Sequence, residues 1–168
     1  MLKVQRHFLE IKLNFQKKGT IILPQEYKFS LEEKSKFIIN KFFYKQIGMD
    51  HYWRDRLIWT DKEWLSYCSK NNFETWVIKK NDDLVGFYEQ EYHPLSNEVE
   101  LINMGVLKEY RGKKLGSALL YHSIEMAFKK KPNRMWVHTC SLDHKYALKN
   151  YLERGFKIFK KEEINFIP

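Results

Sequence analysis

The alternation of apolar and polar residues along the chain predicts an α/β fold with a mixed sheet. Alternating runs rich in β-branched and aromatic residues predict strands, whereas apolar residues three or four positions apart predict amphipathic helices. The predicted strands are Val4–Leu13, Trp76–Lys80, Leu84–Tyr92, Asn97–Leu107 and Met135–Cys140, with a last hairpin in Phe156–Phe166. The predicted helices are Leu31–Ile47, one from Thr60 or Asp61 to Ser69, Gly112–Lys130 and a short one between Asp143 and Gly155. This order predicts one domain, with about seven strands flanked by about four helices.

Capping and turn residues set the expected boundaries of these elements. Ser30, with Glu33 three residues later, has the pattern of a capping box for the first helix, and Gly48 is a stop signal. Asp143 is the expected N-cap of the short last helix. The turn Asn81-Asp82-Asp83 predicts a hairpin between the strands on either side of it.

A turn punctuated by glycines precedes the third helix. In the segment VLKEYRGKKLGSALL, residues 106–120, a strand ends, Gly112 and Gly116 follow, and Arg111, Lys113 and Lys114 lie around the helix start. A helix start leaves backbone N–H groups without partners, and the aligned peptide dipoles add partial positive charge. Glycines allow those amides to approach an anion closely. The segment therefore predicts a site for a bound phosphate.

Composition and charge narrow the class of protein. The chain has 168 residues, 43% of them hydrophobic, which is enough for one domain with its own core. Thirty Lys and Arg against 21 Asp and Glu give a net charge of +9, which favours anionic partners. Nucleic acid, an acidic lipid surface and a phosphorylated cofactor all fit that charge, which does not choose among them.

The cysteines and the hydrophobic runs predict a soluble protein of the cytoplasm. Cys68 and Cys140 lie far apart without a CxxC spacing, so neither a disulfide framework nor a thiolate zinc site is indicated. His138, Cys140 and His144 lack the paired spacing of most zinc ligands, so no metal is expected. No segment has a signal-peptide core or approaches the ~20 apolar residues of a membrane span, so no membrane partner is expected.

Two motifs in the second half of the chain resemble GNAT-type N-acetyltransferases. The segment YRGKKLGSALL is followed some thirty residues later by VHTCSLDHKYALKNYLERGF. Together they resemble the acetyl-CoA-binding core of that family, over roughly the last 75 residues. The resemblance implies a GNAT-like mixed central sheet, acetyl-CoA as co-substrate, and direct transfer of an acetyl group to a primary amine in a ternary complex.

The resemblance also implies which residues contact the cofactor. In the family, an Arg or Gln followed by glycines wraps the pyrophosphate, and an Ala-xxx-Tyr-xxx-Gly-Phe run follows, here Ala147 to Phe156. The implied cofactor-binding residues are Met104, Gly105, Val106, Arg111, Gly112, Lys113, Lys114, Leu115, Gly116, Ser117 and His144. Lys114 stands where glycine is commonest and is compatible if its backbone is helical. His144 stands where an Asn often bonds the pantetheine arm, and it can still donate one hydrogen bond.

Amide transfer requires a group that takes a proton from the acceptor. An amine with a pKa near ~10 must lose that proton before its nitrogen attacks. Glu100, on the strand that the resemblance places beside the thioester, is the first candidate base, with Glu89, Glu91 and Glu98 in reserve. The alternative is that Glu98 and Glu100 form a solvated strand face. If the four glutamates line the pocket, their mutual repulsion predicts a cationic amine as acceptor.

The resemblance also implies which groups stabilise the acyl oxygen and the leaving sulfur during transfer. A backbone N–H near Val106 is placed by analogy to receive the charge that develops on the acyl oxygen. Tyr151 resembles the tyrosine that donates a proton or a hydrogen bond to the coenzyme sulfur. Full transfer from a phenol to a thiol is uphill by about 2 kcal/mol, so hydrogen-bond donation or a lowered phenol pKa is expected. Without the motif, Tyr151 would be read as a packing aromatic.

Two other functions remain open from the sequence. The same fold could bind acyl-CoA as a sensor without turnover. A basic nucleic-acid-binding module is less well supported, because the basic residues are spread along the chain and no RNA-binding signature is present, so no nucleic acid partner is expected. A small-molecule amine and a peptide amine both stay open as acceptors, and so do a monomer and a homodimer.

Overall fold

The computed structural model describes residues 2–12 and 21–167, and their strands form one seven-stranded mixed sheet. The strand order is β2-β3-β4-β5-β6-β1-β7. All neighbouring strands are antiparallel except β5 and β6, which are parallel. The strands are β1 (Leu2–Lys12), β2 (Tyr27–Leu31), β3 (Phe73–Lys80), β4 (Asp83–His93), β5 (Glu98–Val106), β6 (Arg134–Cys140) and β7 (Lys157–Phe166).

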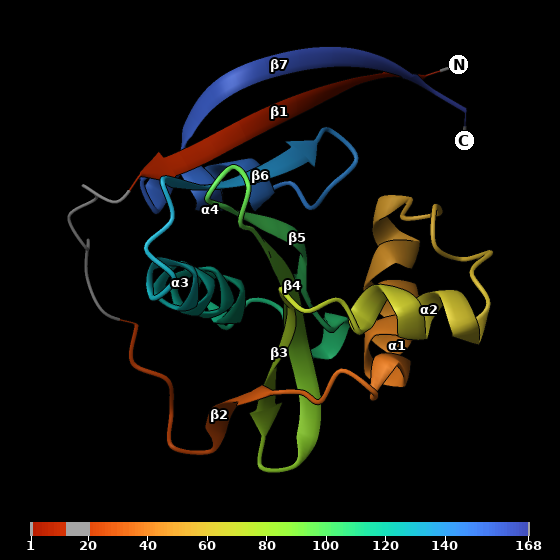
Figure 1. Cartoon of the computed structure of the whole chain (residues 1–168), viewed down its shortest axis with the longest axis vertical. Coiled ribbons are helices and arrows are strands. Elements are labelled where there is room, and N and C mark those ends of the chain that lie inside the picture. The colour runs from red at the N-terminus through yellow and green to blue at the C-terminus, as the bar shows by residue number, and fades with distance from the viewer. Residues whose placement is uncertain (1, 13–20, 168) are drawn as a thin grey trace.

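In the described part of the chain, four α-helices cover the two faces of this sheet. They are α1 (Phe37–Gly48), α2 (Asp61–Cys68), α3 (Leu115–Phe128) and α4 (Ala147–Glu153), with short 3-10 turns η1 (Met49–His51) and η2 (Lys108–Tyr110). Figure 1 shows α3 on one side of the sheet and α1 with α2 on the other. None of the helices in residues 2–12 and 21–167 has the length and apolar character that crossing a bilayer requires.

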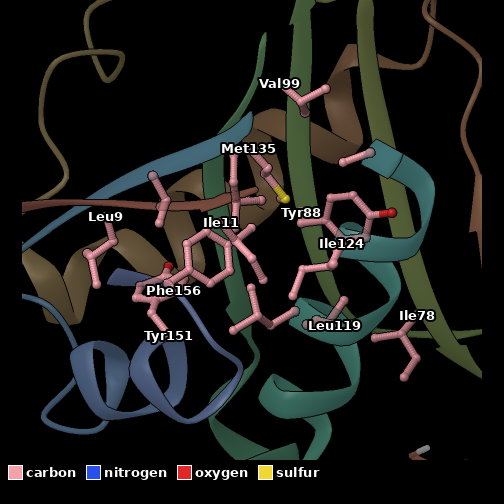
Figure 2. Packing of buried hydrophobic residues seen from close by; sticks show 14 of the residues in the cluster. Leu9, Ile11, Ile78, Tyr88, Val99, Leu119, Ile124, Met135, Tyr151 and Phe156 are labelled. Atoms are coloured by element: carbon pink, nitrogen blue, oxygen red, sulfur yellow. The ribbon is translucent and has the colours of Figure 1, made fainter. Parts of the chain in front are cut away.

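The main core lies between α3 and the centre of the sheet. Leu119 and Ile124 of α3 converge with Leu9 of β1 and Met135 of β6, and all four are nearly or fully buried (Figure 2). Tyr151 joins the same cluster from α4. Because apolar burial is the dominant favourable term in folding, this cluster holds both α3 and α4 against the sheet. The predicted single domain with a mixed sheet and four helices is confirmed.

The first and last strands lie side by side, which the sequence pattern did not predict. Residues 157–166 form the single strand β7, which pairs with β1 from Glu10↔Lys157 to Leu2↔Phe166. The predicted hairpin in Phe156–Phe166 is therefore wrong. The segment IFKKEEIN has no glycine or proline at which a tight turn could form, so the chain continues extended along β1.

The start of α1 also differs from the prediction. Residues 27–31 form the edge strand β2, and α1 begins only at Phe37. Ser30 lies inside β2, and its hydroxyl donates a hydrogen bond to the carboxylate of Glu32. The predicted capping box of Ser30 and Glu33 is therefore wrong. By contrast, Thr60 caps α2 with a complete capping box, as the predicted helix start requires. Residue 13 of the first predicted strand lies outside the described residues.

The parallel ladder between β5 and β6 is short. It contains the pairs Glu98↔Arg134, Val99↔Met135 and Glu100↔Trp136. Beyond these pairs β5 continues to Val106 along β4, and β6 continues to Cys140 along β1. The two strands therefore separate and leave a gap in the middle of the sheet.

Candidate functional site

A cavity of about 1030 Å³ lies at the gap between β5 and β6. One wall is the end of β5, residues 101–106, and the opposite wall includes Val137, His138 and Cys140 of β6. The start of α3 and the inner side of α4 line one part of the cavity, and the loop after η1 lines another. Strands β1 and β7 complete the wall beyond β6. The cavity thus reaches both faces of the sheet through the gap.

The free edge of β5 presents backbone groups to this cavity. The N–H of Leu107 donates to the carbonyl of Val85 on β4, at 2.9 Å. In an antiparallel ladder, neighbouring residues direct their N–H and C=O groups to opposite edges of the strand. Val106 therefore turns its backbone groups away from β4 and toward the gap. Its carbonyl accepts a hydrogen bond from Nε of Arg111, at 3.3 Å.

Helix α3 begins on the cavity wall without a side-chain cap. Its N-cap residue is Lys114, and the first backbone bond of the helix runs from the N–H of Ala118 to the carbonyl of Lys114, at 3.1 Å. The N–H groups of residues 115–117 precede that bond and have no partner within the helix. The expectation of a helical backbone at Lys114 is wrong, because its φ is +60°. A left-handed backbone is unfavourable for lysine and easy for glycine, so lysine is the less favourable residue at this position.

The glycines of this turn leave room beside those amides. A Cβ added at Gly116 would meet nothing within 4 Å, so the space beside this residue is open cavity. Gly112 is also open, and its φ of +80° favours glycine on conformational grounds. Gly105 differs, because a Cβ there would lie 2.7 Å from Ile47. Gly116 therefore gives direct access to the start of α3, and Gly105 allows α1 to pack on β5.

The basic residues of the turn have different surroundings. Arg111 lines the cavity and pairs with Asp50 of η1 at 3.0 Å. The hydrogen bond from Arg111 lowers the pKa of Asp50 below its usual value. Lys114 also lines the cavity, whereas Lys113 lies outside its wall, with Nζ 5.5 Å from the ring centre of Tyr110. Of the three basic residues of the turn, Arg111 and Lys114 therefore present their charges to the cavity.

Helix α4 brings Tyr151 to the cavity wall. The side chain is 7% exposed, and burial raises the pKa of its phenol above the usual value, with the nearby Asp143 carboxylate adding to the effect. The hydroxyl is therefore protonated across the neutral range and can act as a donor. Asn150 fastens α4 to α3 by accepting from Ser117 Oγ at 3.0 Å. The predicted alternative of a lowered Tyr151 pKa is wrong.

The loop between β6 and α4 closes one side of the gap. Asp143 does not cap α4 as predicted, because its carboxylate accepts from Thr139 Oγ1 at 2.7 Å and from the N–H of Cys140 at 2.9 Å. It therefore stabilises the end of β6 instead. His144 lines the cavity, 6.0 Å from the ring of His51 across the gap, and burial lowers its pKa.

The four glutamates singled out in the sequence lie away from the cavity wall, and each has a partner within the chain. Glu98 pairs with Arg134 at 2.8 Å and Glu91 with Lys70 at 2.5 Å. Glu100 lies 2.9 Å from Nε2 of His93, so its position does not support a role as base. Glu89 pairs with Arg56 at 2.9 Å. The clustering of the glutamates therefore gives no support to a cationic acceptor.

The buried ion pair of Glu89 and Arg56 stabilises the part of β5 that lines the cavity. Glu89 is fully buried, and it also accepts from Asn40 of α1 and from Asn103 of β5, both at 2.9 Å. Asn103 lines the cavity, at the point where the register between β4 and β5 shifts. This network therefore joins α1, the loop before α2 and the irregular part of β5 that faces the gap.

Most of the predicted cofactor-binding residues come together on this wall. Met104, Gly105 and Val106 on β5, the turn from Arg111 to Ser117 apart from Lys113, and His144 all line the cavity, as does Tyr151. The sequence reasoning missed Arg6 and the position of His138, which reach the cavity only through strand pairing. Within the described part of the chain, no three His, Cys, Asp or Glu side chains gather as metal ligands.

Comparisons with known proteins identify related sequences and folds. Residues 38–156 match the model of the acetyltransferase (GNAT) family. No curated protein matches the sequence significantly.

Solved structures with the same fold include acetyltransferases of several kinds. An aminoglycoside acetyltransferase from an uncultured soil metagenomic sample has a TM-score of 0.65 at 14% identity, covering 77% of this chain and 88% of that one. A GCN5-related N-acetyltransferase from Sphaerobacter thermophilus has a TM-score of 0.70 at 14% identity, over 94% and 49%. The ribosomal-protein-S18-alanine N-acetyltransferase from Escherichia coli has a TM-score of 0.61 at 19% identity, over 78% and 77%. At these identities the likeness is one of fold.

Removing the Arg56 charge should destabilise the protein strongly. Arg56→Met leaves the buried Glu89 carboxylate without its cation, so the free energy of unfolding in urea should fall by about 3–5 kcal/mol. The matched control is Lys41→Met, which breaks the exposed pair with Asp61 at 2.7 Å and should change little. Equal stability of the two variants would contradict the supporting role of the network.

Proposed function

The chain is a member of the acetyltransferase (GNAT) family, and we propose that it transfers an acetyl group from acetyl-CoA to a primary amine. The observation that carries this proposal is the cavity at the gap between β5 and β6, with the uncapped start of α3 on its wall. The open space beside Gly116 fits a phosphate group held by backbone amides. When bound, acetyl-CoA supplies the activated acyl group.

The turn before α3 would bind the pyrophosphate of the cofactor, and the end of β5 would bind its acyl group. The N–H groups of residues 115–117 and the Lys114 ammonium would bind the pyrophosphate. Arg111 is held by Asp50 and by the carbonyl of Val106, and its role would be to fix the turn as well as to add positive charge. The N–H of Val106 faces the gap and would stabilise negative charge on the acyl oxygen.

Tyr151 would donate a hydrogen bond to the leaving sulfur. Its phenol is buried on the cavity wall and protonated in the neutral range, since burial raises its pKa. A raised pKa makes complete proton transfer to a thiolate less favourable, so donation without transfer is the role that fits. This role requires the hydroxyl but not a change in its charge.

His138 fits the role of proton acceptor better than Glu100. It lies on the cavity wall two residues beyond the last pair of β5 and β6, whereas Glu100 belongs to that last pair. Desolvation lowers the pKa of His138, and the charge of Arg6 lowers it further. At neutral pH the imidazole is therefore largely uncharged and able to take a proton from the acceptor ammonium, directly or through water.

A sensor that binds acyl-CoA without turnover remains the second candidate. The same cavity supports it, because binding requires the turn but neither Tyr151 nor His138. Release of free thiol from acetyl-CoA, measured with a panel of amines, separates the two: the transferase releases thiol only when an amine is present. Binding with no release for any amine would favour the sensor.

Gly116→Val should weaken binding of acetyl-CoA without unfolding the protein. The valine side chain would enter open cavity rather than the core, and it would cover the amides at the start of α3. The dissociation constant, measured by calorimetry, should rise about tenfold or more, since at least one charge-assisted hydrogen bond is lost. Gly116→Ala is the smaller control. Unchanged affinity in the valine variant would remove the turn from the binding site.

Tyr151→Phe should lower turnover much more than cofactor affinity. Loss of one hydrogen bond to a charged sulfur corresponds to a fall in kcat of about 10- to 100-fold. The affinity for acetyl-CoA, measured on the same sample, should change little because the ring still packs in the core. An unchanged kcat would exclude Tyr151 from the mechanism.

His138→Asn should lower kcat/KM by about 100-fold, the lower end of the range for general base catalysis. In the wild type, kcat/KM should fall as the pH drops through the lowered pKa of His138, because the protonated imidazole accepts no proton. This acid limb should lie below the ordinary histidine value and vanish in the variant. Glu100→Gln is the matched comparison and should keep the limb. The reverse result would assign the role to Glu100.

A further inference from the structure

We propose that the acceptor amine carries an anionic group, such as the carboxylate of an amino acid, and that Arg6 binds this group. The inference rests on the proposed transferase function and names the substrate class for it. The wall concerned is formed by β1, β7 and the loop between η1 and α2. Its two strands lie outside residues 38–156, the segment that matches the family model.

Arg6 lines the cavity, and the carboxylate of Glu162 on the neighbouring strand offsets its charge only in part. Its neighbours across the strands are Cys140 on β6 and Glu162 on β7. Glu162 is held by Lys160 at 2.5 Å, and Arg6 forms no ion pair in the described part of the chain. Nε of Arg6 is buried and has no hydrogen-bond partner there. A guanidinium on a cavity wall with an unmet N–H is suited to a carboxylate.

A second arginine lies on the same wall. Arg54, on the loop after η1, has its guanidinium 5.3 Å from the ring centre of Tyr52 and 5.7 Å from that of Phe166. Within the described residues it too forms no ion pair, and the loop contributes one cavity carboxylate, Asp55. Among the side chains of this wall that line the cavity, two are cations and one is an anion, so the wall favours an anionic group over a polycationic amine.

The other carboxylates on the cavity wall are already engaged. Asp143 accepts from Thr139 and from the backbone of Cys140. Glu153 pairs with Lys149 at 3.6 Å. Within the described residues neither carboxylate forms an ion pair with Arg6 or with Arg54.

Arg6 is placed beside the proposed proton acceptor. Phe8 of β1 pairs with His138, and Arg6 pairs with Cys140, so Arg6 and His138 are diagonal neighbours on the same face of adjacent strands. Such diagonal neighbours have backbones about 7–8 Å apart. An amino acid whose carboxylate binds Arg6 would therefore hold its amine within reach of His138. The start of α3 forms a different part of the cavity wall and stays free for the cofactor.

The test compares amino acids with their carboxamides, which keep the amine and lose the negative charge. Thiol release is measured with acetyl-CoA for each pair, and binding of the N-acetyl acid and the N-acetyl amide to the CoA-bound protein is measured by calorimetry. For at least one pair we expect a preference of about tenfold or more for the acid, the size expected for a charged hydrogen bond. Arg6→Gln should remove most of that preference and leave the affinity for CoA unchanged.

Two further variants keep the outcome interpretable. Arg54 lies on an exposed loop, and Arg54→Gln should weaken the preference for acids in part. The test therefore does not depend on the folding of Arg6→Gln alone. Lys62→Gln removes one exposed charge of α2, away from the cavity, and should keep the preference. Amides as good as acids in every pair, or a preference that survives Arg6→Gln, would overturn the inference. If only the amides are turned over, the inference about the anionic group fails but the transferase function stands. If acids bind selectively and no thiol is released, the transferase function fails but the inference about the anionic group stands.

Discussion

The candidate site depends on the early end of the parallel ladder between β5 and β6. Only the pairs up to Glu100↔Trp136 form, although both strands continue. Each strand is held on its far side, β5 by β4 and β6 by β1, so the separation costs neither strand its other partner. Backbone groups along the gap are then left for a ligand to meet, since buried N–H and C=O groups are almost always paired.

The two layers of helices hold the gap open from opposite faces. On one face, α3 and α4 share an apolar core with the sheet, and the contact of Ser117 with Asn150 ties their cavity ends together. On the other face, the buried carboxylate of Glu89 links α1, the loop before α2 and Asn103 of β5. The first arrangement is mainly apolar. The second is polar and directional, and it fixes the side on which the proposed acceptor would bind.

Local sequence signals predicted much of the fold and of the cofactor side of the site. The helix start at Thr60 or Asp61 and the glycine turn before α3 depend on residues close in the chain, and the structure has both. The positive φ of Lys114 was missed because lysine gives no local sign of a left-handed backbone. Ser30 was misread because a polar residue before an acidic one suits a strand end as well as a helix start.

The acceptor side could not be predicted, because it is built by pairing between the ends of the chain. Arg6 reaches the cavity only because β1 enters the sheet between β6 and β7. The glutamates of β4 and β5 illustrate the opposite error: their alternation was visible, but their cationic partners come from distant segments such as Arg56 and Arg134. Charge patterns along one strand say little about a site until those partners are known.

The most direct test of the account is an NMR titration of the ¹⁵N-labelled protein with acetyl-CoA, following assigned backbone amides. The account predicts that the largest shifts occur at Val106 on the free edge of β5 and at Gly116 and Ser117 at the start of α3, while the edge strand β2 stays unchanged. Largest shifts on another surface, with these three amides unmoved at saturation, would contradict it.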